Sequence, residues 1–117
     1  MNRLFILDYS GTLTIFLDPA QFLLDLRRKY PEARVVLYTG IEKSAIDKEH
    51  PSLLSLMDEV WTKPQFIKDL VLGMAPDHLV LADDEPFTLR AYRRMFHNCG
   101  IQTVTYLSPQ ELKALVP

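Results

Sequence analysis

The stretch LFILDYSGTLT, residues 4–14, leads from four apolar residues into a single aspartate, Asp8, and then into a loop with one glycine and several hydroxyl side chains. A short, continuous apolar run is typical of a strand that is covered on both faces of a sheet. Similar runs recur along the chain: VVLY at 35–38, the weaker EVWT at 59–62, LVLA at 79–82 and TVTY at 103–106. The sequence therefore predicts a buried five-stranded sheet, with Asp8 at the end of its first strand.

Helix signals occupy the segments between these strands. Asp18 followed by Pro19 is a typical helix start, and apolar residues at helical spacing continue to a stop at Pro31. The other helical segments are 41–58, as one or two helices interrupted near Pro51, 64–74, ending near Gly73, 86–99, with Gly100 as its C-terminal cap, and 108–115, with Ser108 as its N-terminal cap. Because parallel strands need crossover connections, this alternation predicts an α/β fold, a three-layer, Rossmann-like sandwich around a parallel sheet.

Apolar spacing also predicts which side chains of these segments face the core. Phe66 and Phe87 are expected on the apolar faces of their helices. The residues IFL at 15–17 form either a short flap beside the first loop or, as we expect, part of the core.

The composition is that of an ordinary soluble domain. The 117 residues are 48% apolar and 24% charged, with a formal net charge of −2, which argues against a disordered or fibrous chain and gives no basic excess for nucleic-acid binding. Cys99 is the only cysteine, so neither an internal disulfide nor a cysteine-rich zinc site is expected. Asp8 interrupts the first apolar run too early for a signal peptide or a membrane span. We therefore expect one domain, residues 1–117, in the cytoplasm.

Polar residues follow the predicted strands. They are Asp8 after the first strand, Thr39 and Gly40 after the second, Lys63 after the third, and Asp83 and Asp84 after the fourth. Each of them is also common in an ordinary turn or helix cap. Because the carboxyl ends of parallel strands meet at one edge of a sheet, where ligands bind in such folds, we expect these side chains to lie close together. Tyr9 and Tyr38 flank two of these positions, and each either lines a substrate pocket or packs against a loop.

This combination of side chains has a chemical meaning. Three carboxylates at one edge would offer hard oxygen ligands, which suit Mg²⁺. A hydroxyl, a lysine ammonium and the backbone N–H groups of the loop after Asp8 would complement the oxygens of a phosphate. The pattern therefore indicates phosphoryl transfer, in which one carboxylate can act as the nucleophile.

The segments ILDYSGTLT (6–14), VLYTG (36–40), TKP (62–64) and LVLADDEP (79–86) resemble, in this order, the four motifs of the haloacid dehalogenase-like superfamily. The resemblance covers nearly the whole chain. Receiver domains of response regulators use the same residue types in another order, with the acidic pair first. Here the single acid comes first and the pair comes late.

The resemblance implies a strand order of 3-2-1-4-5 and a role for each matching residue. Asp8 resembles the nucleophile that forms an aspartyl-phosphate, and Asp83 and Asp84 resemble the acidic pair that holds Mg²⁺ directly or through water. The backbone carbonyl of Ser10 would also hold the metal, and Lys63 would neutralise charge on the nucleophile and the phosphate. The phosphate contacts would come from Gly11, Thr12, Thr39, Gly40 and Lys63.

Ser10 departs from the usual motif. Phosphatases of this superfamily carry a second aspartate at this position, which protonates the leaving group and later activates water. A hydroxyl cannot serve efficiently as a general acid or base near neutral pH, a role that typically contributes about 10²- to 10⁴-fold. The loop DYSGT resembles instead the Asp-x-Thr-Gly-Thr loop of P-type ATPases, whose aspartyl-phosphate persists. We therefore expect slow hydrolysis, and a preference for aryl or acyl phosphates.

A second departure concerns the cap domain that many members of this superfamily carry. Only a few residues separate the first motif from Asp18, and about twenty separate Thr39 from the next strand, so we expect no cap. Capless relatives tend to have open sites that accept bulky or macromolecular phosphates, or they borrow a neighbouring subunit as a lid. The expected partner is thus a phosphorylated small molecule or macromolecule, with a homo-oligomer left open.

Three functional hypotheses follow from these residues. The first is a Mg²⁺-dependent phosphohydrolase or phosphotransferase that acts through Asp8. The second is a binding or regulatory protein that keeps the metal and phosphate site without useful turnover, as Ser10 suggests. The third, by analogy with receiver domains, is that phosphorylated Asp8 is itself a signal.

Overall fold

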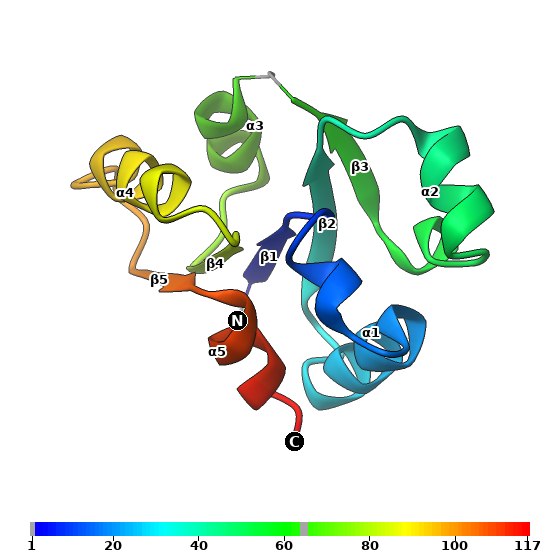
Figure 1. The fold of residues 1–117 in the computed structure, drawn as a ribbon. Helices are drawn as coiled ribbons and strands as arrows, with labels where there is room; N and C mark the ends of the chain where they lie inside the picture. The colour runs from blue at the N-terminus through cyan, green and yellow to red at the C-terminus, as the bar shows by residue number, and fades with distance from the viewer. Residues whose placement is uncertain (1, 64–65) are drawn as a thin grey trace.

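The computed structural model describes residues 2–63 and 66–117, and within them it forms one parallel sheet flanked by helices (Figure 1). The strands are β1 (Arg3–Leu7), β2 (Arg34–Thr39), β3 (Glu59–Thr62), β4 (His78–Ala82) and β5 (Thr103–Leu107). All neighbouring pairs are parallel, and the order across the sheet is β3-β2-β1-β4-β5. The predicted α/β fold and the predicted strand order are confirmed.

Helices cover both faces of this sheet. They are α1 (Pro19–Lys29), α2 (Lys43–Glu49), α3 (Ile67–Met74), α4 (Pro86–Met95) and α5 (Pro109–Ala114), with short 3-10 turns η1 (Leu13–Ile15) and η2 (Leu54–Leu56). In residues 2–63 and 66–117, none of these helices has the length and apolar composition that crossing a bilayer requires.

The core is divided by the sheet into two apolar clusters. Successive side chains of a strand point to opposite faces, so Phe5 and Leu7 of β1 pack with residues of α1, α2 and α5. Leu4 and Ile6 pack on the other face with residues of α3 and α4. Figure 1 shows α3 and α4 together on one side of the sheet and α1 and α5 on the other. The molecule is thus a three-layer sandwich with two buried faces.

The predicted N-terminal ends of α1 and α5, each with a proline at the first helical position, are confirmed. The Asp18 carboxylate accepts a hydrogen bond from the Gln21 backbone N–H at 3.1 Å and so caps α1, which opens with Pro19. Ser108 caps α5 in a reciprocal arrangement with Glu111. Each cap satisfies backbone donors that have no partner inside the helix.

One predicted helix end is confirmed and another differs from the prediction. Helix α4 ends at Met95, and Gly100, the predicted cap, lies five residues further on, where it adopts a φ of 90° in a separate turn. Helix α3 ends at Met74, next to Gly73 as predicted, and Ala75 has the left-handed conformation that follows it. The predicted start of this helix at Pro64 lies outside the described residues. A glycine near the end of an apolar pattern thus marked the right region but not the residue at which either helix ends.

Four apolar residues expected in the core are instead exposed. Phe66 precedes α3 and is 87% exposed, and Phe87 in the first turn of α4 is 71% exposed. Of the segment 15–17, Phe16 is buried and stacks on Phe22 with ring centroids 4.2 Å apart. Its two neighbours are exposed, Ile15 at 42% and Leu17 fully, so the prediction that the whole segment belongs to the core was wrong.

Candidate functional site

The parallel register brings the carboxyl ends of β1, β2, β3 and β4 to one edge of the sheet. Leu7 lies opposite both Leu37 and Ala82, so the residues that follow β1 and β4 start at the same level. Backbone hydrogen bonds continue past the strands, because the Asp8 N–H donates to the Ala82 carbonyl at 3.1 Å and the Lys63 N–H to the Thr39 carbonyl at 2.9 Å. The side chains that the sequence predicted at this edge therefore start from a fixed backbone.

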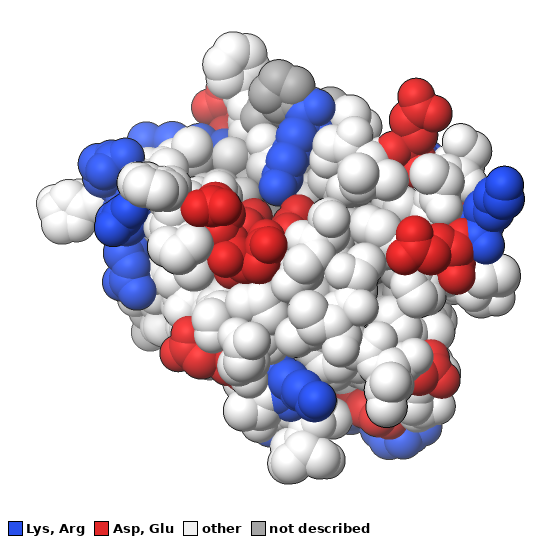
Figure 2. Space-filling view, in the orientation of Figure 1, with Lys and Arg blue, Asp and Glu red and all other residues white. Residues whose placement is uncertain are grey.

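Lys63 joins the two most buried of the predicted carboxylates. Its Nζ lies 3.1 Å from Oδ1 of Asp8 and 3.5 Å from Oδ2 of Asp83, and these aspartates are only 8% and 3% exposed. Figure 2 shows acidic side chains gathered at the centre of this face, with a basic side chain next to them. Buried charges are stable only when they are paired and hydrogen-bonded, so the lysine holds both carboxylates in place.

The ionisation of these groups reflects burial together with their mutual charges. Burial raises the pKa of Asp8 to about 6, and the negative charge of Asp83 adds to this increase while Lys63 opposes it. Burial also raises the pKa of Asp83. Burial alone would lower the pKa of Lys63, but the carboxylates of Asp8 and Asp83 outweigh it and raise that pKa. The lysine is therefore charged at neutral pH, and the carboxylates carry a negative excess that an additional cation would relieve.

Asp84 completes a group of three carboxylates. One oxygen from each of Asp8, Asp83 and Asp84 lies within 4.8 Å of the other two. Mg²⁺ binds carboxylate oxygens at about 2.0–2.1 Å, which separates two ligands on opposite sides of the ion by about 4 Å. The donor set and its spacing therefore fit a hard divalent cation after small side-chain movements.

Gly11 is required where the first loop passes this group. Its φ is +76°, and a Cβ atom at this position would overlap the Asp84 carboxylate, only 2.7 Å from its Cγ. Only glycine combines that backbone conformation with so close an approach. The loop and Asp84 are thus packed directly against each other.

The hydroxyl groups of the predicted site are already engaged in positioning. Thr12 is fully buried, and its Oγ1 donates to Oδ2 of Asp8 at 3.3 Å. Thr39 is also buried, and its Oγ1 accepts a hydrogen bond from the Ile41 N–H at 3.0 Å, which leaves its hydroxyl hydrogen for another acceptor. Ser10 and Gly40 are exposed at the surface of the site.

The backbone donors of the first loop are directed inward. The Gly11 N–H donates to Oγ1 of Thr14 at 2.9 Å, and the Thr12 N–H donates to the Tyr9 carbonyl at 3.3 Å. The predicted phosphate contacts from Gly11 and Thr12 remain predictions, and the N–H groups would have to exchange these partners to make them.

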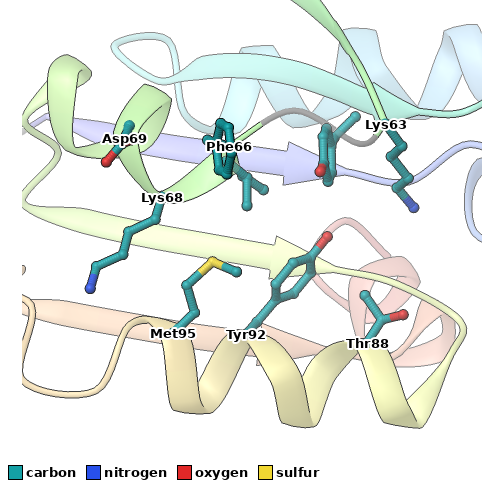
Figure 3. Close-up of a pocket in the computed structure, with 9 residues that line it drawn as sticks. Lys63, Phe66, Lys68, Asp69, Thr88, Tyr92 and Met95 are labelled. Atoms are coloured by element: carbon teal, nitrogen blue, oxygen red, sulfur yellow. The ribbon is translucent and has the colours of Figure 1, made fainter.

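A groove adjoins the polar residues on the side of α3 and α4, and the sequence alone did not predict it. Its volume is about 450 Å³. Residues that line it include Tyr38, Lys63, Phe66, Thr88, Tyr92 and Met95 (Figure 3). Of the two tyrosines that flank the strand ends, Tyr38 therefore contributes to a pocket. Tyr9 packs instead against His50, with the rings edge to face at 6.0 Å.

Searches against known protein families and among curated proteins found no match to this chain.

Proposed function

We propose that this chain is a Mg²⁺-dependent phosphohydrolase or phosphotransferase of the haloacid dehalogenase-like superfamily, which acts through an aspartyl-phosphate on Asp8. The observation that carries the proposal is the Asp8–Lys63–Asp83 arrangement, two buried carboxylates on one ammonium, with Asp84 within 4.8 Å. The order of the four motifs and the confirmed strand order 3-2-1-4-5 support the same assignment.

Asp8 is the proposed nucleophile. Its carboxylate forms a bond to phosphorus as the ester bond of the substrate breaks, and the leaving oxygen takes the electron pair of that bond. Lys63 and Thr12 hydrogen-bond to different oxygens of Asp8, and this fixes the orientation of the carboxylate. Water then cleaves the acyl-phosphate, or an acceptor takes the phosphoryl group, and Asp8 is restored.

Three aspartates would hold the metal. Asp8, Asp83 and Asp84 supply carboxylate oxygens, and the Ser10 carbonyl would add a neutral one. When bound, Mg²⁺ neutralises negative charge on the carboxylates and on the phosphate, so that the two can approach. Lys63 adds a fixed positive charge on the same side, where charge develops in the transition state.

Ser10 limits the substrates that such a site can use. A serine hydroxyl does not protonate a leaving group efficiently near neutral pH. The departing oxygen must therefore be stable as an anion, which holds for phenols and carboxylic acids but not for ordinary alcohols. We expect aryl or acyl phosphates to react faster than alkyl phosphates.

A second candidate is a protein that binds a divalent cation and a phosphate without useful turnover. Ser10 favours it, and so do the N–H groups of Gly11 and Thr12, which donate within their own loop. This candidate predicts that Mg²⁺ and phosphate raise the thermal unfolding temperature while no product forms.

The first experiment is hydrolysis of p-nitrophenyl phosphate with Mg²⁺ by the wild-type protein and by Asp8→Asn. We expect the substitution to lower the rate by at least about 10³-fold, because it removes the nucleophile, and a chelator to have a similar effect. Asp47→Asn, at an exposed position of α2, is the matched control and should keep full activity.

Equal rates for wild type and Asp8→Asn would exclude Asp8 as the nucleophile. A wild-type protein that gives no product but is stabilised by Mg²⁺ and phosphate would favour the second candidate. Ser10→Asp tests the restriction on substrates, since it should raise hydrolysis of an alkyl phosphate such as glycerol 2-phosphate.

A further inference from the structure

We propose that the groove between α3 and α4 binds the aromatic group of an aryl phosphate substrate while the phosphate lies at Asp8. This assignment rests on the proposed function, because it places the non-reacting part of the substrate relative to the proposed nucleophile. It adds a specificity pocket, in which Lys63 is joined by side chains that take no part in the proposed reaction.

The groove is continuous with the candidate site through Lys63. The ammonium of this residue hydrogen-bonds Asp8 at 3.1 Å, and the same side chain lines one end of the groove. Its Nζ also lies 5.3 Å from the centre of the Tyr38 ring, which forms part of the wall. A phosphate held beside Lys63 would therefore carry its ester substituent to the mouth of the groove.

The lining of the groove is suited to a flat, uncharged ring. Figure 3 shows Tyr92 and Met95 rising from α4 toward the wall that carries Phe66, with Lys63 and Thr88 at one end and Lys68 and Asp69 toward the other. Aromatic rings bind other rings in offset or edge-to-face contacts, and a thioether makes favourable contacts with a ring edge. The opposite charges of Lys68 and Asp69 give that end no net preference for a charged substituent.

The size of the groove agrees with this occupant. A cavity of about 150 Å³ lined by apolar side chains is large enough for benzene, and this groove has a volume of about 450 Å³. The groove would therefore hold one aromatic ring, or two fused rings, which would displace water from it. The restriction that Ser10 places on the leaving group points independently to phenols, because they leave as stable anions.

The aromatic preference can be measured without turnover. Phenylphosphonate and methylphosphonate carry a carbon–phosphorus bond that the proposed reaction does not cleave, and they differ only in the group that would enter the groove. We expect calorimetric titration in Mg²⁺ to show that the wild-type protein binds phenylphosphonate about tenfold more tightly than methylphosphonate.

Two exposed phenylalanines provide a matched pair of variants. Phe66 lines the groove, whereas Phe87, also exposed, is not among its lining residues. Phe66→Ala should reduce the preference for phenylphosphonate by about threefold, and Phe87→Ala should leave it unchanged. Thr88→Trp, which would fill the end of the groove nearest Lys63, should abolish the preference while methylphosphonate still binds.

Equal affinity of the two phosphonates for the wild-type protein would overturn the assignment. Equal effects of Phe66→Ala and Phe87→Ala on this preference would also overturn it. These outcomes are distinct from failure of the proposed reaction, which would appear as the absence of Asp8-dependent turnover in proteins that still discriminate between the phosphonates.

Discussion

The polar edge of the sheet and the groove between α3 and α4 share Lys63 but are built in different ways. At the edge, Asp8, Lys63 and Asp83 directly follow a strand, and backbone hydrogen bonds to neighbouring strands fix their positions. The groove depends on side chains from β2, α3 and α4, and on Lys63 and Phe66, which lie between β3 and α3. The separation of the two helices is set by how they pack on the sheet. The edge concentrates charge, and the groove offers mainly apolar surface.

The largest expected difference between the two regions concerns their lysines. Lys63→Met removes the ammonium that contacts Asp8 and Asp83 but keeps an apolar stem of similar length. We expect kcat for an aryl phosphate to fall by about 10²- to 10³-fold, because a preorganised positive charge at the phosphoryl group is lost.

Lys68→Met is the matched control for this variant. Lys68 also lines the groove but lies away from Lys63 in Figure 3, and its replacement should change kcat by less than about twofold. If both variants lost activity equally, the charge at the edge would not be responsible, and the distinction between the two regions would fail.

The edge could be predicted from the sequence because strand ends follow simple rules. A continuous apolar run identifies a buried strand, and parallel strands end at the same edge. Asp8, Lys63 and Asp83 directly follow a strand, and Thr39 is the last residue of one. Their pairing could not be predicted in the same way. The position of Lys63 between two carboxylates depends on side-chain conformations and on burial, neither of which has a sequence period.

The groove escaped prediction because α4 carries two apolar stripes. Phe87 and Ala91 lie on one of them, and Tyr92 and Phe96 lie on the other, both at helical spacing. Periodicity does not decide which stripe faces the sheet. In the structure Tyr92 and Phe96 are buried and Phe87 is exposed, because Tyr92 and Phe96 pack in one apolar cluster with residues of α3 and the strands. The shape of the groove therefore depends on which of the two stripes packs against the sheet.

The stability contributed by the charged edge should depend on pH more strongly than that contributed by the groove. Burial raises the pKa of Asp8 from 3.8 to about 6 in the folded chain. The folded state therefore binds this proton more tightly than the unfolded state, and the contribution of Asp8 to stability falls as the pH rises from about 4 to about 6. The difference in pKa corresponds to about 3 kcal/mol.

Urea unfolding of the metal-free protein tests this sign. At pH 7, Asp8→Asn should be more stable than the wild-type protein by up to about 3 kcal/mol, and the gain should disappear below about pH 4. Phe66→Ala, in the groove, should show the same dependence on pH as the wild type. A constant difference between Asp8→Asn and wild type across this range would contradict the raised pKa.

The smallest effects are expected for substitutions of two glycines, one in the first loop at the polar edge and one in helix α3. Gly11 has a φ of +76° and lies against Asp84, whereas Gly73, in helix α3, has open space around the position of a Cβ atom. Gly11→Ala should lower the free energy of unfolding by at least about 1–2 kcal/mol, because alanine is strained in that conformation, and should weaken Mg²⁺ binding by displacing Asp84. Gly73→Ala should raise the free energy of unfolding by about 0.5–1 kcal/mol, because alanine loses less conformational freedom in a helix.

Urea unfolding of both variants, with and without Mg²⁺, checks both signs. If Gly11→Ala kept the wild-type stability and the wild-type stabilisation by Mg²⁺, the close packing of the first loop on Asp84 would not be needed to hold the metal site together.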